Sequence, residues 1–212
     1  MTDPRTQYLA AAPTALDLIA HPHVAAKWTE PSALEGFTVG GLTAHLAQQI
    51  TSVTAALAAP PTGKEVVGLY EHYDRAAWLA ADLDNDYNTS IRDGGHTAAE
   101  SGPEAVHTQA AEALKALAEQ LPTLEGDSTS GNPRWPYATT LDDFLATRIM
   151  EFVVHTDDLA CSVGLDTPKF DQDAFDTAAA ILARLAAKRH GQAALVRSLA
   201  RAERAPAVIS GL

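Results

Sequence analysis

The sequence has few of the residues that cross-link a chain or fix it in a membrane. Cys161 is the only cysteine among 212 residues, so no disulfide can form within the chain. Because Cys161 lies in an apolar helical stretch, we expect a packed core thiol rather than a nucleophile. No apolar stretch reaches the roughly 18 residues that a transmembrane helix needs. The N-terminus also lacks the layout of a signal peptide. We therefore expect a cytoplasmic protein with no membrane partner.

Positive charge is also scarce. Lys and Arg number 15 against 27 Asp and Glu, which gives a net charge of −12 and a pI near 4.9. Such a surface repels a polyanion, so we expect no nucleic-acid partner.

The pattern of apolar residues favours helices throughout. Ala and Leu dominate the apolar positions, and these positions recur at intervals of three and four. Thr38 and Thr140 are placed to cap helices, and Pro103 stands where a helix can begin. Pro13 predicts a kink or a late start in the first helix. The polar stretch 84–102 is predicted to be a long loop that forms part of a pocket wall. Helices are predicted over residues 5–20, 38–58, 65–82, 103–121, 141–163 and 172–190.

These helices predict an all-α protein, a helix bundle whose helices are joined by loops. We expect a single domain over residues 1–212, with its core at about 5–190 and a C-terminal tail at about 191–212. The tail is expected to begin as a helix and to end extended.

The helix predicted at 141–163 places charged residues on its apolar face. Arg148, Glu151 and His155 share that face, since residues four apart differ by only about 40° around a helix. Charged groups are costly in a core unless they are paired or bind a metal. His45 lies at the edge of the apolar stripe of an earlier helix. Two imidazoles and a carboxylate form a common catalytic zinc site. The four-residue spacing by itself favours an ordinary pair of helix neighbours, and with the inward placement of these residues both interpretations stay open.

Two segments resemble a known family. The run S-A-L-E-G-F-T-V-G-G-L-T-A-H-L, which ends at His45 and Leu46, occurs with R-I-M-E-F-V-V-H-T-D-D-L. Together they resemble the DinB-like superfamily, and more narrowly the N-terminal domain of mycothiol-dependent maleylpyruvate isomerases. The resemblance implies a four-helix bundle that is often a homodimer. It also implies that His45, Glu151 and His155 bind a divalent metal, usually zinc, and that mycothiol is the thiol cosubstrate.

The isomerases of this family carry a second, smaller domain that this sequence does not match. We therefore expect metal binding and thiol chemistry rather than the isomerase reaction as such. The predicted function is transfer or addition of mycothiol, or a similar low-molecular-weight thiol, to an electrophilic small molecule, with or without isomerisation. Two alternatives stay open, namely a metal-dependent hydrolase that activates water and a non-catalytic bundle that binds a metal or a small molecule.

Four further residues are candidates for the same site. Asp158 is expected either to orient His155 or to lie on the helix surface. Arg148 is expected to pair with Glu151 or to bind an anionic substrate. Gln49, one turn after His45, and His96, in the predicted polar loop, are candidates for binding a cofactor or substrate.

Overall fold

The described part of the chain, residues 2–76 and 85–212 of a computed structural model, is almost entirely helical. This confirms the all-α prediction. Two antiparallel strands of two residues each, β1 (Thr129–Ser130) and β2 (Thr139–Thr140), hold the loop before α7. The helices are α1 (Pro4–Ile19), α2 (Pro22–Ala26), α3 (Val39–Ala58), α4 (Leu69–Arg75), α5 (Asp86–Ala99), α6 (Pro103–Gln120), α7 (Leu141–Val163), α8 (Gln172–His190) and α9 (Gln192–Ala200).

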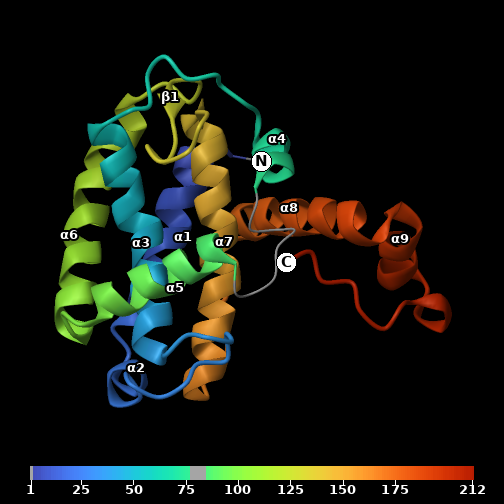
Figure 1. Ribbon diagram of the computed structural model, residues 1–212, viewed down its shortest axis with the longest axis horizontal. Coiled ribbons are helices and arrows are strands. Elements are labelled where there is room, and N and C mark those ends of the chain that lie inside the picture. The colour runs from blue at the N-terminus through green and yellow to red at the C-terminus, as the bar shows by residue number, and fades with distance from the viewer. Residues whose placement is uncertain (1, 77–84) are drawn as a thin grey trace.

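Four long helices form the body of the molecule. Figure 1 shows α1, α3, α6 and α7 standing side by side, and each contacts at least two of the others. α5 crosses in front of α3, whereas α8 leaves the bundle sideways and carries α9 at its far end (Figure 1). The architecture is therefore a four-helix bundle with peripheral helices.

Side chains at the helix ends explain where the long helices begin. The Thr38 hydroxyl accepts a hydrogen bond from the backbone N–H of Gly41, 3.0 Å away, and so caps α3. The Thr140 hydroxyl caps α7 by accepting from the N–H of Asp143 at 3.1 Å. Both caps were predicted. These two helices carry the site described below, so the residue at which each helix begins determines which of its side chains point to the site.

The core lies between α1, α3 and α7. Leu46 and Ile50 on α3 and Phe152 on α7 are completely buried. Each such side chain stabilises the fold by roughly 1.5–3 kcal/mol. The ring of Tyr8 on α1 lies 5.3 Å from that of Phe152, and its hydroxyl donates to the carbonyl of Gln49 at 3.1 Å. The three helices are thereby held together close to the functional side chains.

Several local predictions are wrong. The stretch 84–102 is not a long loop, because α5 occupies Asp86–Ala99 and the side chain of Asn85 caps it. Of the two alternatives predicted for Pro13, the late start is wrong, since α1 begins at Pro4 and continues through Pro13. Of the helix predicted at 65–82, the described residues form only Leu69–Arg75, and residues 77–84 lie outside the described part.

Cys161 is exposed, not a packed core thiol as expected. It follows the buried Leu159 by two residues, which places it about 200° further around α7. Cys161 therefore lies on the side of α7 that faces away from the core.

Candidate metal centre

Three side chains from two helices converge inside the bundle. His45 comes from the second turn of α3, and Glu151 and His155 come from successive turns of α7. Glu151 Oε2 lies 2.9 Å from His155 Nε2 and 3.9 Å from His45 Nε2. One possible ligand atom from each residue lies within 4.8 Å of the others. Their side chains are only 13–15% exposed, so the cluster is largely shielded from water.

Contacts with α7 and α5 set the position of α3. α3 packs along α7, and α5 crosses α3 where Gly95 meets Gly41. A Cβ on Gly95 would lie 2.9 Å from the Gly41 carbonyl oxygen, which is closer than real Cβ atoms approach. Glycine is therefore needed at this crossing, which lies one turn of α3 before His45.

Asp158 acts as a partner of His155 and is not simply a surface carboxylate. Its Oδ2 lies 3.0 Å from His155 Nδ1, one turn further along α7. This contact favours a proton on Nδ1, so that Nε2, on the side of Glu151, is the nitrogen that can bind a metal once its own proton is lost. A carboxylate behind an imidazole is the usual second partner of a metal-binding histidine.

The three groups shift one another's ionisation. Burial alone would raise the pKa of Glu151, but hydrogen bonds with His155 and His45 hold it well below its usual value. Burial would lower the pKa of His155, but its hydrogen bonds to Asp158 and Glu151 raise it to about 9. Burial lowers the pKa of His45 despite its contact with Glu151. Without a metal, His155 is therefore a cation beside an ionised Glu151, and His45 is neutral.

Arg148 is held by Gln49 rather than by Glu151. Its Nη1 donates to Gln49 Oε1 at 2.7 Å and its Nε donates to Thr147 Oγ1 at 3.1 Å. Within the described residues, no carboxylate lies within ion-pair distance of Arg148, so the expected pair with Glu151 is not formed. The charge of Arg148 still contributes to the low pKa of Glu151. Gln49 also donates to the His45 carbonyl at 2.8 Å, so it links Arg148 to the α3 turn that carries His45.

His96 does not reach the cluster. It lies on α5, and its Nε2 faces the backbone N–H of Thr38 at 3.3 Å. The ring of Phe37 contacts both histidines, at 5.8 Å from the His45 ring and 5.9 Å from the His96 ring. His96 therefore supports the start of α3 and is not part of the group of possible ligands.

An aromatic group near the cluster was missed from the sequence. His72 on α4 is buried, with Nδ1 3.1 Å from the Tyr137 hydroxyl and its ring 4.4 Å from that of Trp135. Burial, helped by the charge of Arg148, lowers the pKa of His72 to about 4. His72 is therefore neutral at physiological pH. No periodic pattern joins residue 72 to 135–137, so only the local density of aromatic residues could have indicated this group.

The cluster fits a divalent metal. Two imidazoles and one carboxylate are a donor set that zinc and similar ions accept, and Asp158 supplies the outer partner. The Nδ1 atom of His45 is buried without a hydrogen-bond partner in the described structure, so His45 has no such outer partner there. The same three ligands could bind several divalent ions.

Comparison with known proteins gives one family. The family model of the mycothiol maleylpyruvate isomerase N-terminal domain matches residues 9–160. This range contains the three clustered residues and Asp158, and it ends before α8. No curated protein and no solved structure gives a match. Among the described helices, none combines the length and apolarity needed to cross a membrane.

Proposed function

This chain belongs to the mycothiol maleylpyruvate isomerase N-terminal domain family, and from that premise we propose that it is a metal-dependent thiol enzyme. Its reaction would add or transfer a low-molecular-weight thiol, such as mycothiol, to an electrophilic small molecule. The observation that carries the proposal is the convergence of His45, Glu151 and His155 at one point that is largely shielded from water. In this proposal His45, Glu151 and His155 hold a divalent metal, most simply zinc.

The chain's own residues prepare the site. Asp158 fixes the tautomer of His155, so that Nε2 faces the other two ligands. Gln49 joins the backbone of His45 to Arg148 and so ties α3 to α7 at the level of the site. A metal in this position would supply one chemical effect, since it lowers the pKa of a coordinating thiol.

The thiol must come from a substrate. Cys161 is exposed and lies about 120° around α7 from His155, so it does not point to the cluster. The proposed reaction therefore needs no cysteine of the protein. Attack of the substrate thiolate on an electrophilic carbon forms the carbon–sulfur bond. In an addition the π bond at that carbon breaks and its electron pair takes up the proton that the thiol gave up, whereas in a transfer the bond to the leaving group breaks and the leaving group departs with the electron pair.

Thiol consumption is the test of this proposal. Zinc-loaded protein would be incubated with mycothiol and a panel of electrophiles that includes maleylpyruvate, and the free thiol would be measured with time. We expect metal-dependent thiol loss that disappears in His45→Ala and persists in His23→Ala, which removes an exposed imidazole on α2.

Two results would contradict the proposal. Turnover of esters or amides without any thiol would indicate a hydrolase. Metal-dependent folding without turnover of any substrate would indicate a structural or binding site.

A further inference from the structure

The surface has a hollow whose lining includes none of the three residues of the candidate metal centre. It has a volume of about 340 Å³ and opens between α4, the last turns of α8 and the start of α9. Tyr73 and Leu185, both nearly completely buried, form its floor. Tyr70 and Ala187 add apolar surface to its walls. The size and the apolar floor are typical of a small-molecule site.

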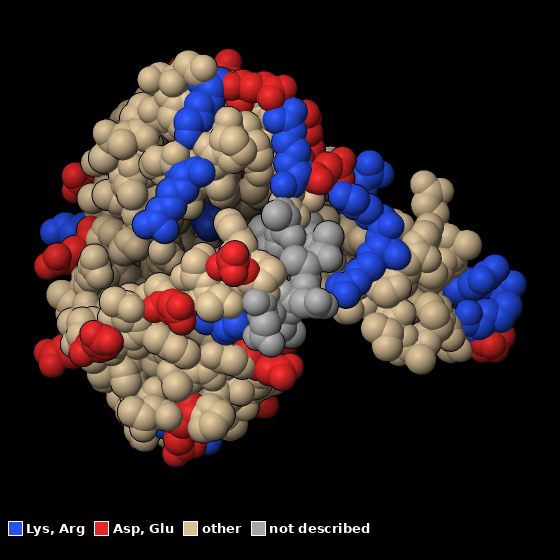
Figure 2. All heavy atoms as spheres, in the orientation of Figure 1, with Lys and Arg blue, Asp and Glu red and all other residues tan. Residues whose placement is uncertain are grey.

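The charge around this hollow is opposite to that of the whole protein. The chain has a net charge of −12, yet Arg184 and Lys188 both line the hollow. Figure 2 shows basic side chains gathered over α8 and beside α4. Among the described residues of the lining, Asp74 is the one acidic residue, and its Oδ1 pairs with Lys188 Nζ at 2.7 Å. Within the part of the lining that the structure describes, the positive charge of Arg184 is thereby left without a balancing carboxylate.

The guanidinium of Arg184 contacts an aromatic ring and not a carboxylate of the described residues. Its guanidinium carbon lies 5.4 Å from the centre of the Tyr70 ring. Across the described ranges, no carboxylate lies within ion-pair distance of Arg184. The negative end of a helix dipole often accounts for basic residues near the C-terminus of a helix, but this stabilising effect is confined to the last turn. The last turn of α8 already has Lys188, Arg189 and His190, and Arg184 lies before it.

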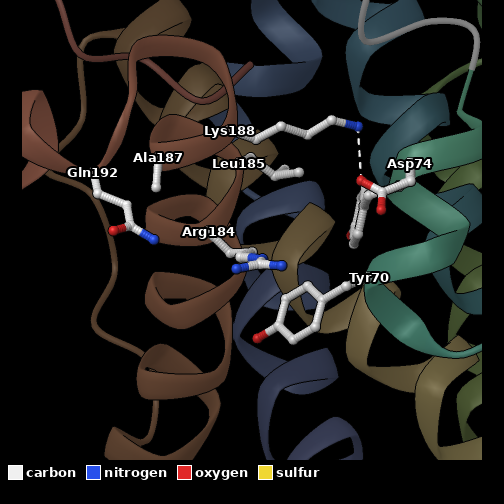
Figure 3. Close-up of a pocket in the computed structure, with 8 residues that line it drawn as sticks. Tyr70, Asp74, Arg184, Leu185, Ala187, Lys188 and Gln192 are labelled. Carbon is white, nitrogen blue, oxygen red and sulfur yellow. Dashed lines mark hydrogen bonds and ion pairs between the residues drawn. The ribbon is translucent and has the colours of Figure 1, made fainter.

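We infer that this hollow binds a small aromatic carboxylate. Figure 3 shows the Arg184 guanidinium and the Gln192 amide pointing into the space that faces Tyr70. The planar guanidinium matches a carboxylate with two parallel hydrogen bonds, and the Gln192 amide offers another donor. The ring of the ligand would pack on Leu185 and against Tyr70. A single unbalanced positive charge beside apolar surface suits a monoanion with a flat apolar body.

Titration with benzoate tests the inference on the intact protein. Isotope-labelled protein would be titrated with benzoate and, separately, with its neutral analogue benzamide, and backbone amide shifts would be followed by NMR. We expect the shifts to concentrate at residues lining the hollow, with a dissociation constant of about 1 mM or below. Arg184→Gln should weaken benzoate binding roughly tenfold or more. Arg189→Gln, which removes a neighbouring charge outside the lining, should leave it unchanged.

Three results would overturn the inference. The first is equal affinity of the wild type and Arg184→Gln for benzoate, and the second is equal affinity for benzamide and benzoate. The third is inorganic phosphate binding as tightly as benzoate, which would indicate a simple anion patch. None of these measurements depends on a metal at the His45 cluster. Their outcome is therefore independent of whether the proposed thiol activity is correct.

Discussion

Replacement of Asp158 by Ala should weaken metal binding by an amount that depends on pH. Asp158 Oδ2 lies 3.0 Å from His155 Nδ1 and affects that imidazole in two ways. It orients the ring, and loss of such a partner costs roughly 10–100-fold in metal affinity. It also helps to raise the pKa of His155 to about 9, against the lowering effect of burial, so a proton competes with the metal.

The two effects act in opposite directions below pH 9. With a pKa of about 9, only about one His155 in a hundred is deprotonated at pH 7, and about half are at pH 9. Wild-type metal affinity should therefore rise roughly tenfold per pH unit over this range. Without Asp158 the pKa falls and the proton competes less. The deficit of Asp158→Ala should approach roughly 10–100-fold near pH 9 and shrink towards pH 7.

Competition with a chromophoric zinc chelator at several pH values measures this deficit. Asp157→Ala is the matched control, because Asp157 has the same charge but is bonded to Thr167 and not to His155. The control should bind zinc like the wild type at every pH. A deficit for Asp158→Ala that is absent, constant with pH or largest at pH 7 would refute the reasoning.

Two further predictions concern stability. Gly95→Ala should destabilise the fold by about 1–3 kcal/mol, because its Cβ would meet the Gly41 carbonyl at 2.9 Å. Gly94→Ala, with nothing within 4 Å, should be neutral or stabilise α5 by up to about 1 kcal/mol. Urea unfolding of the two variants checks this pair, and equal effects would argue against the close crossing of α3 and α5. The pKa of His72, lowered to about 4 by burial, predicts a stability term that is complete above about pH 6.5 and lost as the pH falls towards 4. The wild type should therefore lose up to about 3 kcal/mol more than His72→Gln between these pH values in the same unfolding assay. Parallel pH profiles would show that His72 is not buried as a neutral group.

The sequence predicts correctly those features of the structure that depend only on residues close together in the chain. The hydroxyls of Thr38 and Thr140 cap the helices as predicted, because an N-cap depends on backbone groups two or three residues away. The inward position of Glu151 and His155 follows from helical periodicity alone. That these residues meet His45 required the packing of two helices about a hundred residues apart, which the family resemblance implied and periodicity did not.

The failures come from contacts made across the fold. α5 has a polar sequence with Gly94 and Gly95 in its last two turns, so its intrinsic helix propensity is low. Its packing on α3 stabilises it as a helix nonetheless. Arg148 bonds with Gln49 on another helix and not with a neighbour on α7, a choice that spacing within α7 cannot reveal. The pairing of His72 with Tyr137 is of the same kind.

Metal content is the most direct test of the central claim. Protein purified without a metal-affinity tag would be examined by elemental analysis beside His155→Ala. The proposed site predicts about one divalent ion per chain in the wild type and a large loss in the variant, since two ligands then remain. Absence of metal from the wild type after reconstitution with zinc, or equal metal in both proteins, would contradict it.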